Sequence, residues 1–127
     1  MDPGNLESSH KGKTGLRRVW SAMFYSFEGF REAYRVEDAF RQEVWLAVVL
    51  GALAMLSPAT GTGKALMIGS LMLVLIVELV NSAVEATVDR VSLEHHRLAK
   101  RAKDIGSAAV MGALINVVVV WLLVWFG

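Results

Sequence analysis

Residues 78–89 read Glu78-Leu-Val-Asn81-Ser82-Ala-Val-Glu85-Ala-Thr-Val-Asp89, and they follow an almost unbroken apolar run over 65–77. A helix turns by about 100° per residue, so the carboxylates and the side chains of Asn81 and Ser82 fall on one stripe, while the apolar side chains lie on the other faces. Carboxylates and an amide on a helix of membrane length are costly unless they face protein, water or a metal. The stripe is therefore a hypothesis for a functional site.

The composition favours a membrane protein and excludes several kinds of chemistry. The chain has 127 residues, enough for one domain, and 54% of them are hydrophobic, which is high for a soluble domain. It has no cysteine, so disulfides and thiolate nucleophiles are excluded. A net charge of +1 provides no basic field, and we expect no nucleic-acid partner. The N-terminal region lacks the pattern of a cleavable signal peptide, so insertion would depend on internal spans.

Three apolar segments predict an all-α membrane protein with three transmembrane helices. We expect spans at about 40–57, 64–89 and 104–126. The apolar part of the first span is short for a bilayer crossing, which takes ~20 residues, so Arg41, Gln42 and Glu43 must be shielded by protein or reach the headgroups. Residues 57–63 are predicted to form a turn, and 90–103 a charged connection.

The segment before the first span divides into a tail and an amphipathic helix. Residues 1–15 are rich in Gly, Ser and Pro without apolar periodicity, and they are predicted to be a disordered tail. Residues 16–35 carry apolar side chains at helical spacing, many of them aromatic, with arginines at the edges. This pattern is typical of a helix that lies in the membrane interface.

The basic residues predict an orientation in the membrane. Of the 13 Lys and Arg residues, seven precede the apolar run of the first span, which starts at Val44, and five lie between the second and third spans. The remaining one, Lys64, lies at the end of the first turn. By the positive-inside rule, the N-terminus and the second connection are cytoplasmic and the C-terminus is on the opposite side.

The acidic residues of the second helix could serve more than one kind of chemistry. Glu78 and Glu85 would lie about 10 Å apart along the axis at ~1.5 Å per residue. A magnesium-bound nucleotide needs hard oxygen ligands, which Glu85 and Glu37 could supply, while Glu78 in a drier setting could act as a general base. The same carboxylates could instead pair between helices, or form the proton or cation relay of a small transporter. Residue chemistry alone leaves relay and phosphoryl transfer equally open.

Two further motifs do not support a site. Gly61-Thr-Gly-Lys-Ala65 resembles the end of a phosphate-binding loop, but the loop's first glycine position holds Pro58 and Ala65 replaces the required Ser or Thr. We interpret it as a turn and a helix start. His95 and His96 are adjacent rather than four residues apart, which is a poor spacing for a metal site on a helix.

A long, irregular set of motifs resembles a known family. The chain contains Glu78-x-x-Asn81-Ser82-Ala83-x-Glu85-x-x-x-Asp89-Arg90, then Glu94-x-His96, then Arg101-Ala102-Lys103-Asp104-x-Gly106-Ser107-Ala108-Ala109-Val110, with Ala39-Phe40-Arg41-Gln42-Glu43 and Tyr25-Ser26 upstream. In these motifs it resembles the small integral-membrane diacylglycerol kinases of bacteria, and more closely their Gram-negative branch. The resemblance covers about residues 15–125.

The resemblance implies a fold, an activity and a location. Members of the family phosphorylate diacylglycerol to phosphatidate with ATP and Mg²⁺. The family implies a homotrimer in the bacterial inner membrane, with one surface helix and three spans per subunit over residues 16–127, a cytoplasmic N-terminus and a periplasmic C-terminus. Its active sites lie between neighbouring subunits. One thin chain would also shield its own carboxylates poorly, so self-association is expected on physical grounds.

The resemblance also implies roles for individual residues. Glu78 corresponds to the general base that acts on the lipid hydroxyl, Asn81 assists it, and Glu37 and Glu85 correspond to the magnesium ligands. The ATP-binding positions are Arg18, Tyr25, Glu37, Glu85, Glu94, His96, Lys103 and Asp104. The substrate-binding positions are Arg18, Ala22, Ser26, Arg31, Gln42, Glu43, Glu78, Ser107 and Trp121.

Two alternatives to diacylglycerol phosphorylation remain at this point. The first is phosphorylation of undecaprenol, the substrate of related Gram-positive enzymes. The second is a small membrane transporter with a carboxylate relay, which would require neither ATP nor magnesium.

Overall fold

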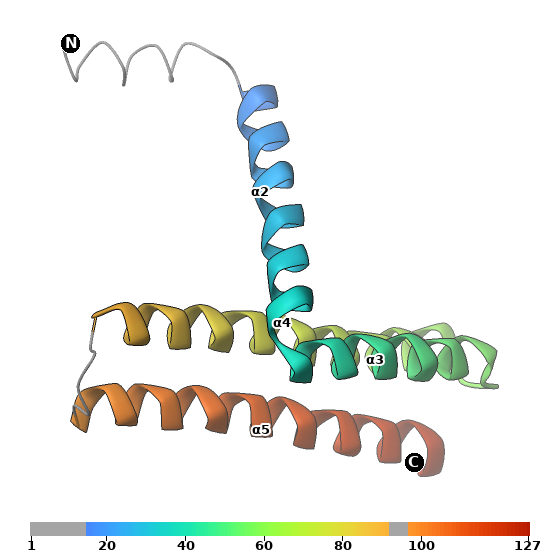
Figure 1. Ribbon diagram of the computed structural model, residues 1–127. Helices are drawn as coiled ribbons and strands as arrows, with labels where there is room; N and C mark the ends of the chain where they lie inside the picture. Colours follow the sequence, from blue (N-terminus) through green and yellow to red (C-terminus); the bar gives the residue numbers. More distant parts are fainter. Residues whose placement is uncertain (1–14, 92–96) are drawn as a thin grey trace. The chain divides into compact units, whose positions relative to one another are not determined.

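The computed structural model describes residues 15–91 and 97–127, and all of its regular structure there is helical. Four helices follow one another: α2 (Gly15–Val36), α3 (Asp38–Leu56), α4 (Gly61–Val91) and α5 (Arg97–Phe126) (Figure 1). The predicted all-α class is confirmed. The predicted tail lies outside the described residues except for Gly15, which begins α2.

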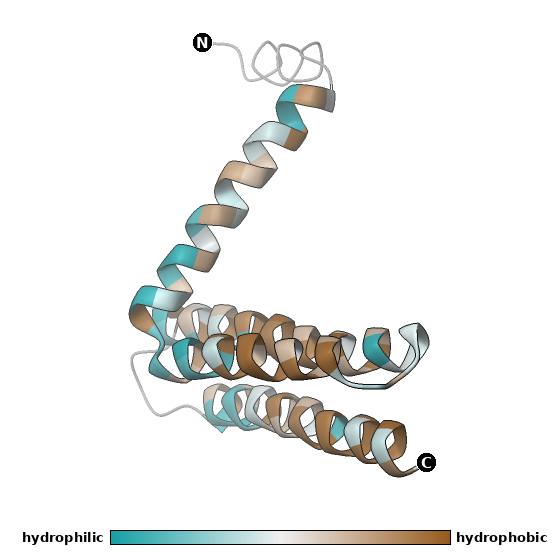
Figure 2. Ribbon diagram, turned by 90° about the vertical axis from the view of Figure 1, so that its right-hand side faces the viewer, coloured by the Kyte–Doolittle hydropathy of each residue, from teal (hydrophilic) through white to brown (hydrophobic). Residues whose placement is uncertain are grey.

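Three of these helices are long and apolar enough to cross a membrane, namely α3, α4 and α5. The prediction of three apolar spans is therefore confirmed. Hydrophilic residues of α3 and α5 gather at one end of these helices, and their middles are hydrophobic (Figure 2). α3 begins at Asp38 and so includes the polar residues Arg41, Gln42 and Glu43. These residues make the helix longer than its apolar run, which alone is short for a bilayer crossing.

The chain divides into two units after Glu32, so that the boundary falls inside α2. The first unit contains the N-terminal part of α2, in which every described residue is exposed. The second unit contains the last residues of α2 and the three long helices.

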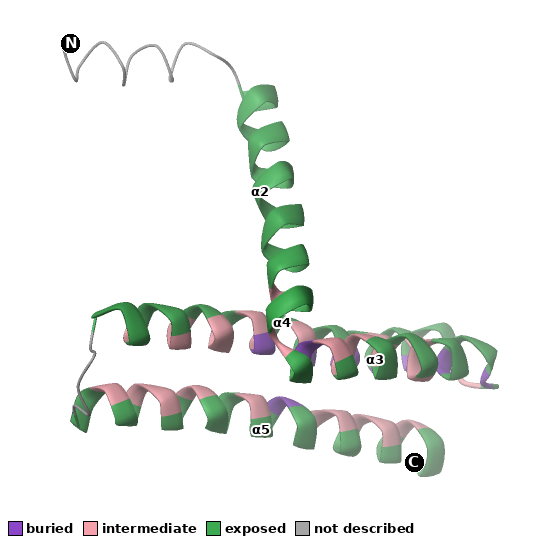
Figure 3. Cartoon of the chain, in the orientation of Figure 1, coloured by how far each residue is buried: buried purple, intermediate pink, exposed green. Residues whose placement is uncertain are grey.

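Within the second unit, α4 is the central helix, because it packs against both α3 and α5. Its buried residues recur every three or four positions, as expected for one face of a helix. They are Gly63, Met67, Ser70, Leu71, Val74 and Glu78. The half-buried residues of α4 and α5 lie on the sides that face each other (Figure 3).

Three contacts set the antiparallel register of α4 and α5. Near one end, a Cβ added to Gly63 would lie 3.2 Å from Val124 Cγ1. In the middle, Trp121 Nε1 donates a hydrogen bond of 3.4 Å to the Met67 carbonyl. Further along, Gly106 lies against the side chain of Asn81. Small residues at both ends of the contact let the helices approach closely.

The turn between α3 and α4 is closed by its own polar side chains. Ser57 Oγ donates to the Ala54 carbonyl at 2.6 Å and accepts from the Ala59 amide at 3.3 Å. Thr60 Oγ1 accepts from the Gly63 amide at 3.1 Å, as a helix N-cap does. The interpretation of the Gly-Thr-Gly-Lys segment as a turn and helix start is confirmed.

The prediction of a charged connection over 90–103 is wrong for residues 90–91 and 97–103, which are helical. α4 continues through Val91, and α5 begins at Arg97, so that only 92–96 lies outside the described helices. The segment from Arg97 is rich in Leu, Ala, Lys and Arg, which favour helix. Lys100 Nζ also pairs with Asp104 Oδ2 at 2.7 Å, four residues later on the same helix.

The second unit covers only a small part of its own apolar surface. In the most apolar windows, 28% of the residues of α4 are buried, against 11% for α3 and 6% for α5. Large side chains such as Trp45, Leu46 and Ile115 are exposed along the outer faces. Such a surface requires an apolar surrounding, as a lipid bilayer provides.

Candidate active site

A buried acidic residue is the centre of the candidate site. Glu78 is 8% exposed, although it lies deep in the apolar helix α4. Its Oε2 atom has no hydrogen-bond partner in the described part of the chain, and neither has Oε2 of Glu43 on α3. Buried carboxylate oxygens without partners are energetically unfavourable and are uncommon in proteins unless a ligand or proton occupies them.

Four carboxylates act on one another at this position. Glu78 is repelled by Glu37 and by Glu85, and Glu43 is repelled by Glu78. Glu37 lies just before α3, Glu43 lies in its second turn, and Glu78 and Glu85 lie two turns apart on α4. These four residues are called the acidic cluster. Several negative charges that act on one another attract cations. No group of three or more acidic or histidine side chains within 15–91 and 97–127 is arranged to hold a metal without further ligands.

Glu37 keeps its side chain available. It is the N-cap residue of α3, with extended backbone angles (φ −101°, ψ 107°), but its carboxylate caps no amide. Its backbone amide instead donates to the Ala33 carbonyl at 2.9 Å, and its carbonyl accepts from the Arg41 amide at 3.2 Å. The backbone therefore fixes Glu37 while the carboxylate can bind elsewhere.

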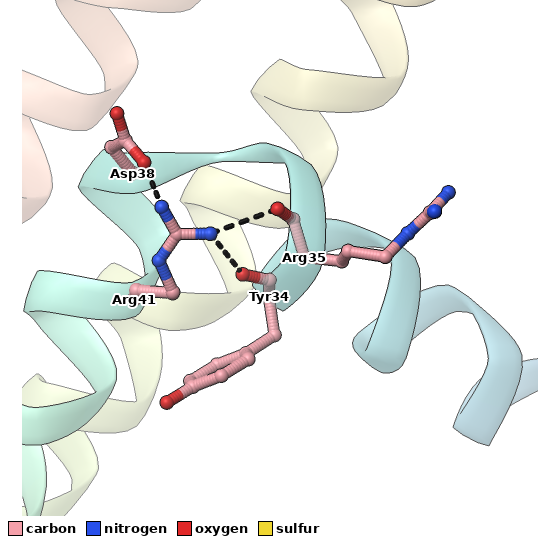
Figure 4. Close-up of polar contacts among 4 residues, drawn as sticks. All are labelled: Tyr34, Arg35, Asp38 and Arg41. Carbon is pink, nitrogen blue, oxygen red and sulfur yellow. Dashed lines mark hydrogen bonds and ion pairs between the residues drawn. The ribbon is translucent and has the colours of Figure 1, made fainter.

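Arg41 holds the junction between α2 and α3 (Figure 4). Its Nη1 donates to the carbonyls of Tyr34 and Arg35 at 2.9 and 2.8 Å, and its Nη2 pairs with Asp38. The last carbonyls of a helix have no partners within it and attract a cation. The Trp45 indole adds a 3.0 Å hydrogen bond to the Tyr34 hydroxyl. The position of Glu37 is thus fixed from both sides.

Asn81 connects the acidic cluster to α5. Its Nδ2 lies 3.4 Å from Oε1 of Glu85, one helical turn away. Its Oδ1 is buried without a hydrogen-bond donor in the described residues. A Cβ added to Gly106 would overlap that oxygen, so the absence of a side chain at Gly106 leaves room for it.

An ion pair closes the polar end of α4 and α5. Lys103 Nζ lies 2.6 Å from Asp89 Oδ1. Lys103 is also attracted by Glu85, one turn before Asp89 on α4. A lysine predicted to contact nucleotide phosphates is therefore held near the acidic cluster.

The structure does not bring the remaining predicted residues of α3 and α5 together with Glu78. Gln42 is exposed on α3, beside an open groove that Trp45, Leu46 and Val49 also line. Ser107 is exposed on α5, one position after Gly106. Trp121 is bound to the carbonyl of Met67, which lies 11 positions before Glu78, or about 16 Å at ~1.5 Å per residue. Trp121 is therefore not part of the acidic cluster.

The other positions lie in the first unit or outside the described residues. Arg18, Ala22, Tyr25, Ser26 and Arg31 are exposed on α2. The Ser26 hydroxyl donates to the Ala22 carbonyl at 2.8 Å, so it is satisfied by its own helix. Glu94 and His96 lie outside the described residues.

The sequence analysis did not predict the roles of three residues in the site. Arg41 binds the last carbonyls of α2, Gly106 leaves room for the Asn81 side chain, and Asp89 forms an ion pair with Lys103. A glycine within an apolar helix is a recognisable signal for close helix approach. The partners of Arg41 and Asp89 depend on tertiary packing, which has no such signal.

Three apolar helices with a buried glutamate and three half-buried carboxylates define a small, multi-pass α-helical membrane protein with an acidic site. The sequence model of the family described as "Prokaryotic diacylglycerol kinase" matches residues 24–125. The chain belongs to this family. It is therefore an enzyme of the kinase class and a multi-pass membrane protein of bacterial type, as the resemblance predicted.

Individual diacylglycerol kinases are similar in sequence to this chain over most of their length. The chain is 53% identical over 120 residues to a diacylglycerol kinase of Pseudomonas aeruginosa. The aligned region covers 94% of this chain and 98% of that protein. It is 48% identical over 116 residues to that of Escherichia coli K12, covering 88% and 93% of the two chains. With the diacylglycerol kinase of Helicobacter pylori 26695 it shares 40% identity over 111 residues, covering 87% and 84%.

Proposed function

We propose that this protein transfers the terminal phosphoryl group of ATP to the free hydroxyl of membrane diacylglycerol and produces phosphatidate. The family and the names of the relatives support the substrate class. The observation that carries the mechanism is the buried Glu78, whose carboxylate oxygen has no partner in the described chain and which lies within an apolar helix. In this proposal, the lipid hydroxyl becomes the partner of that oxygen.

Glu78 acts as the general base in this proposal. Its unpartnered oxygen accepts the proton of the lipid hydroxyl as the oxygen attacks the phosphoryl group. Glu37, Glu43 and Glu85 add three further carboxylates whose charges act on Glu78 or on which Glu78 acts. Asn81, one turn from Glu78 and beside Glu85, positions the base or the acceptor.

Glu37 and Glu85 are the proposed ligands of the magnesium ion that accompanies ATP. The donor set fits this ion, because Mg²⁺ is commonly bound by one or two carboxylates together with phosphate oxygens and waters. When bound, the ion neutralises charge on the phosphates during transfer.

The remaining nucleotide contacts are proposed from the resemblance. Lys103 and Asp104 lie at the polar end of α5, where the ammonium of Lys103 meets phosphates as a point charge. Arg18 and Tyr25 contribute from α2, and Glu94 and His96 from the segment between α4 and α5.

The lipid contacts are also proposed from the resemblance. The resemblance assigns lipid contacts to Gln42 and Glu43 on α3, to Ser107 on α5 and to Trp121 deeper in the membrane. The surface helix contributes Arg18, Ala22, Ser26 and Arg31. The aromatic, amphipathic character of α2 supports its location in the membrane interface.

The proposed assembly is a homotrimer in the bacterial inner membrane, with residues 16–127 as one membrane domain, a cytoplasmic N-terminus and a periplasmic C-terminus. The exposed apolar faces of α3 and α5 leave room for neighbouring subunits as well as lipid. Sites between subunits would complete the shielding of the acidic cluster.

The test is phosphate transfer from labelled ATP in lipid–detergent micelles, with diacylglycerol and undecaprenol offered side by side. We expect labelled phosphatidate, and none when magnesium is chelated. Labelled polyprenyl phosphate would correct the substrate but keep the chemistry. No transfer to either lipid by folded protein would refute the proposal and favour a carboxylate relay.

A further inference from the structure

The ion pair between Asp89 and Lys103 differs from the other described ion pairs. Its atoms, Asp89 Oδ1 and Lys103 Nζ, lie 2.6 Å apart and belong to different helices, α4 and α5. The other pairs seen within 15–91 and 97–127, Arg41 with Asp38 and Lys100 with Asp104, each lie within a single helix. The pair therefore determines where the Lys103 ammonium lies relative to α4.

Two carboxylates of α4 compete for this ammonium. Glu85 and Asp89 are four residues apart, so they lie on the same face, about 6 Å apart along the axis at ~1.5 Å per residue. Lys103 is attracted by both, but it forms its ion pair with Asp89. Among the described residues, the contact seen for the Glu85 carboxylate is the weak one from Asn81 at 3.4 Å.

We propose that Asp89 is a positioning residue, which holds the Lys103 ammonium and so keeps the Glu85 carboxylate free for the cation that accompanies the nucleotide. This inference rests on the proposed function, in which Glu85 is a magnesium ligand. Without the carboxylate at 89, the lysine side chain turns to its second acidic neighbour, Glu85. The ammonium and the metal ion then compete for one carboxylate.

A purely structural role for Asp89 makes a different prediction. If the ion pair only tied the ends of α4 and α5 together, its loss would have little effect, because both side chains are substantially exposed, 63% for Asp89 and 42% for Lys103. It would not direct Lys103 to Glu85, and cation affinity would not change.

The experiment compares the full-length wild type with Asp89→Asn and Asp89→Glu in micelles. A zero-length carbodiimide joins amines to carboxylates that form ion pairs, and mass spectrometry locates the bond. Binding of Mn²⁺, in the presence of a non-hydrolysable ATP analogue, is measured by electron paramagnetic resonance. Glu28→Gln is the control, because it removes one exposed carboxylate from α2.

In the wild type, we expect Lys103 to be joined to Asp89. In Asp89→Asn it should be joined to Glu85, and the Mn²⁺ dissociation constant should rise about two- to fivefold, as expected for one exposed ion pair. Asp89→Glu should restore wild-type affinity, and Glu28→Gln should match the wild type. Unchanged Mn²⁺ affinity in Asp89→Asn, or no bond to Glu85, would overturn the inference. Absence of phosphate transfer by the wild type would instead refute the proposed function.

Discussion

The side-chain oxygen of Asn81 on α4 lies directly against Gly106 on α5, and a single added methyl group at Gly106 would overlap it. Asn81 is also 3.4 Å from Glu85 through its amide nitrogen. The close approach of two helices therefore positions a polar side chain of the candidate active site. The packing of α4 and α5 and the chemistry of the acidic cluster are directly connected.

Gly106→Ala should lower kcat without preventing folding. The added methyl group must push the Asn81 side chain away, and small displacements of a positioned group can reduce rates by about tenfold to a hundredfold. Steady-state phosphate transfer, with the helix content followed by circular dichroism, measures both effects.

Gly112→Ala is the matched control on the same helix, because an added Cβ there meets no atom of the chain within 4 Å. It should retain wild-type activity, since alanine also favours helix over glycine. An equal loss of kcat in Gly106→Ala and Gly112→Ala would show that the contact with Asn81 does not cause the loss.

Glu85→Gln should raise the magnesium concentration needed for half-maximal activity by about tenfold or more, because a neutral amide replaces a proposed carboxylate ligand. Transfer rates are measured over a magnesium titration at saturating ATP. A wild-type magnesium requirement in this variant would argue against ligation by Glu85.

Arg41→Gln should destabilise the junction of α2 and α3 by about 1 kcal/mol, because the carbonyls of Tyr34 and Arg35 lose a charged donor. Unfolding in mixed micelles of increasing denaturing detergent measures this change. Arg17→Gln, which removes an exposed arginine with no polar partner in the described residues, should have no comparable effect.

The predicted orientation can be tested because the natural chain has no cysteine. Thr62→Cys, in the first turn of α4, should react with a membrane-impermeant maleimide in spheroplasts. Arg90→Cys, at the end of α4, should react only after the membrane is opened. The reverse labelling pattern would mean that the N-terminus is periplasmic.

Much of the fold could be predicted from hydropathy and helical periodicity. The three apolar segments and the turn near Pro58 have local signals, and helices α3, α4 and α5 follow them. The start of α5 at Arg97 was missed because a charged segment was interpreted as a connection, although its residues favour helix.

The candidate site was predictable only in part. The stripe that contains Glu78 and Glu85 follows from the helical period of one segment. Glu43 joins them because α3 turns this side chain towards α4, and Asp89 meets Lys103 because α5 packs antiparallel to α4. Such pairings depend on which faces two distant helices present to each other, and one sequence contains no local signal for that.

The most direct test of the account is phosphate transfer by Glu78→Gln under single-turnover conditions. The substitution keeps the size of the side chain and removes the proposed base, whose contribution is ~10²–10⁴-fold in comparable reactions. We predict a loss of transfer in this range or greater, with nucleotide-analogue binding and the size of the assembly unchanged. A transfer rate equal to that of the wild type would contradict the assignment of Glu78 as the base.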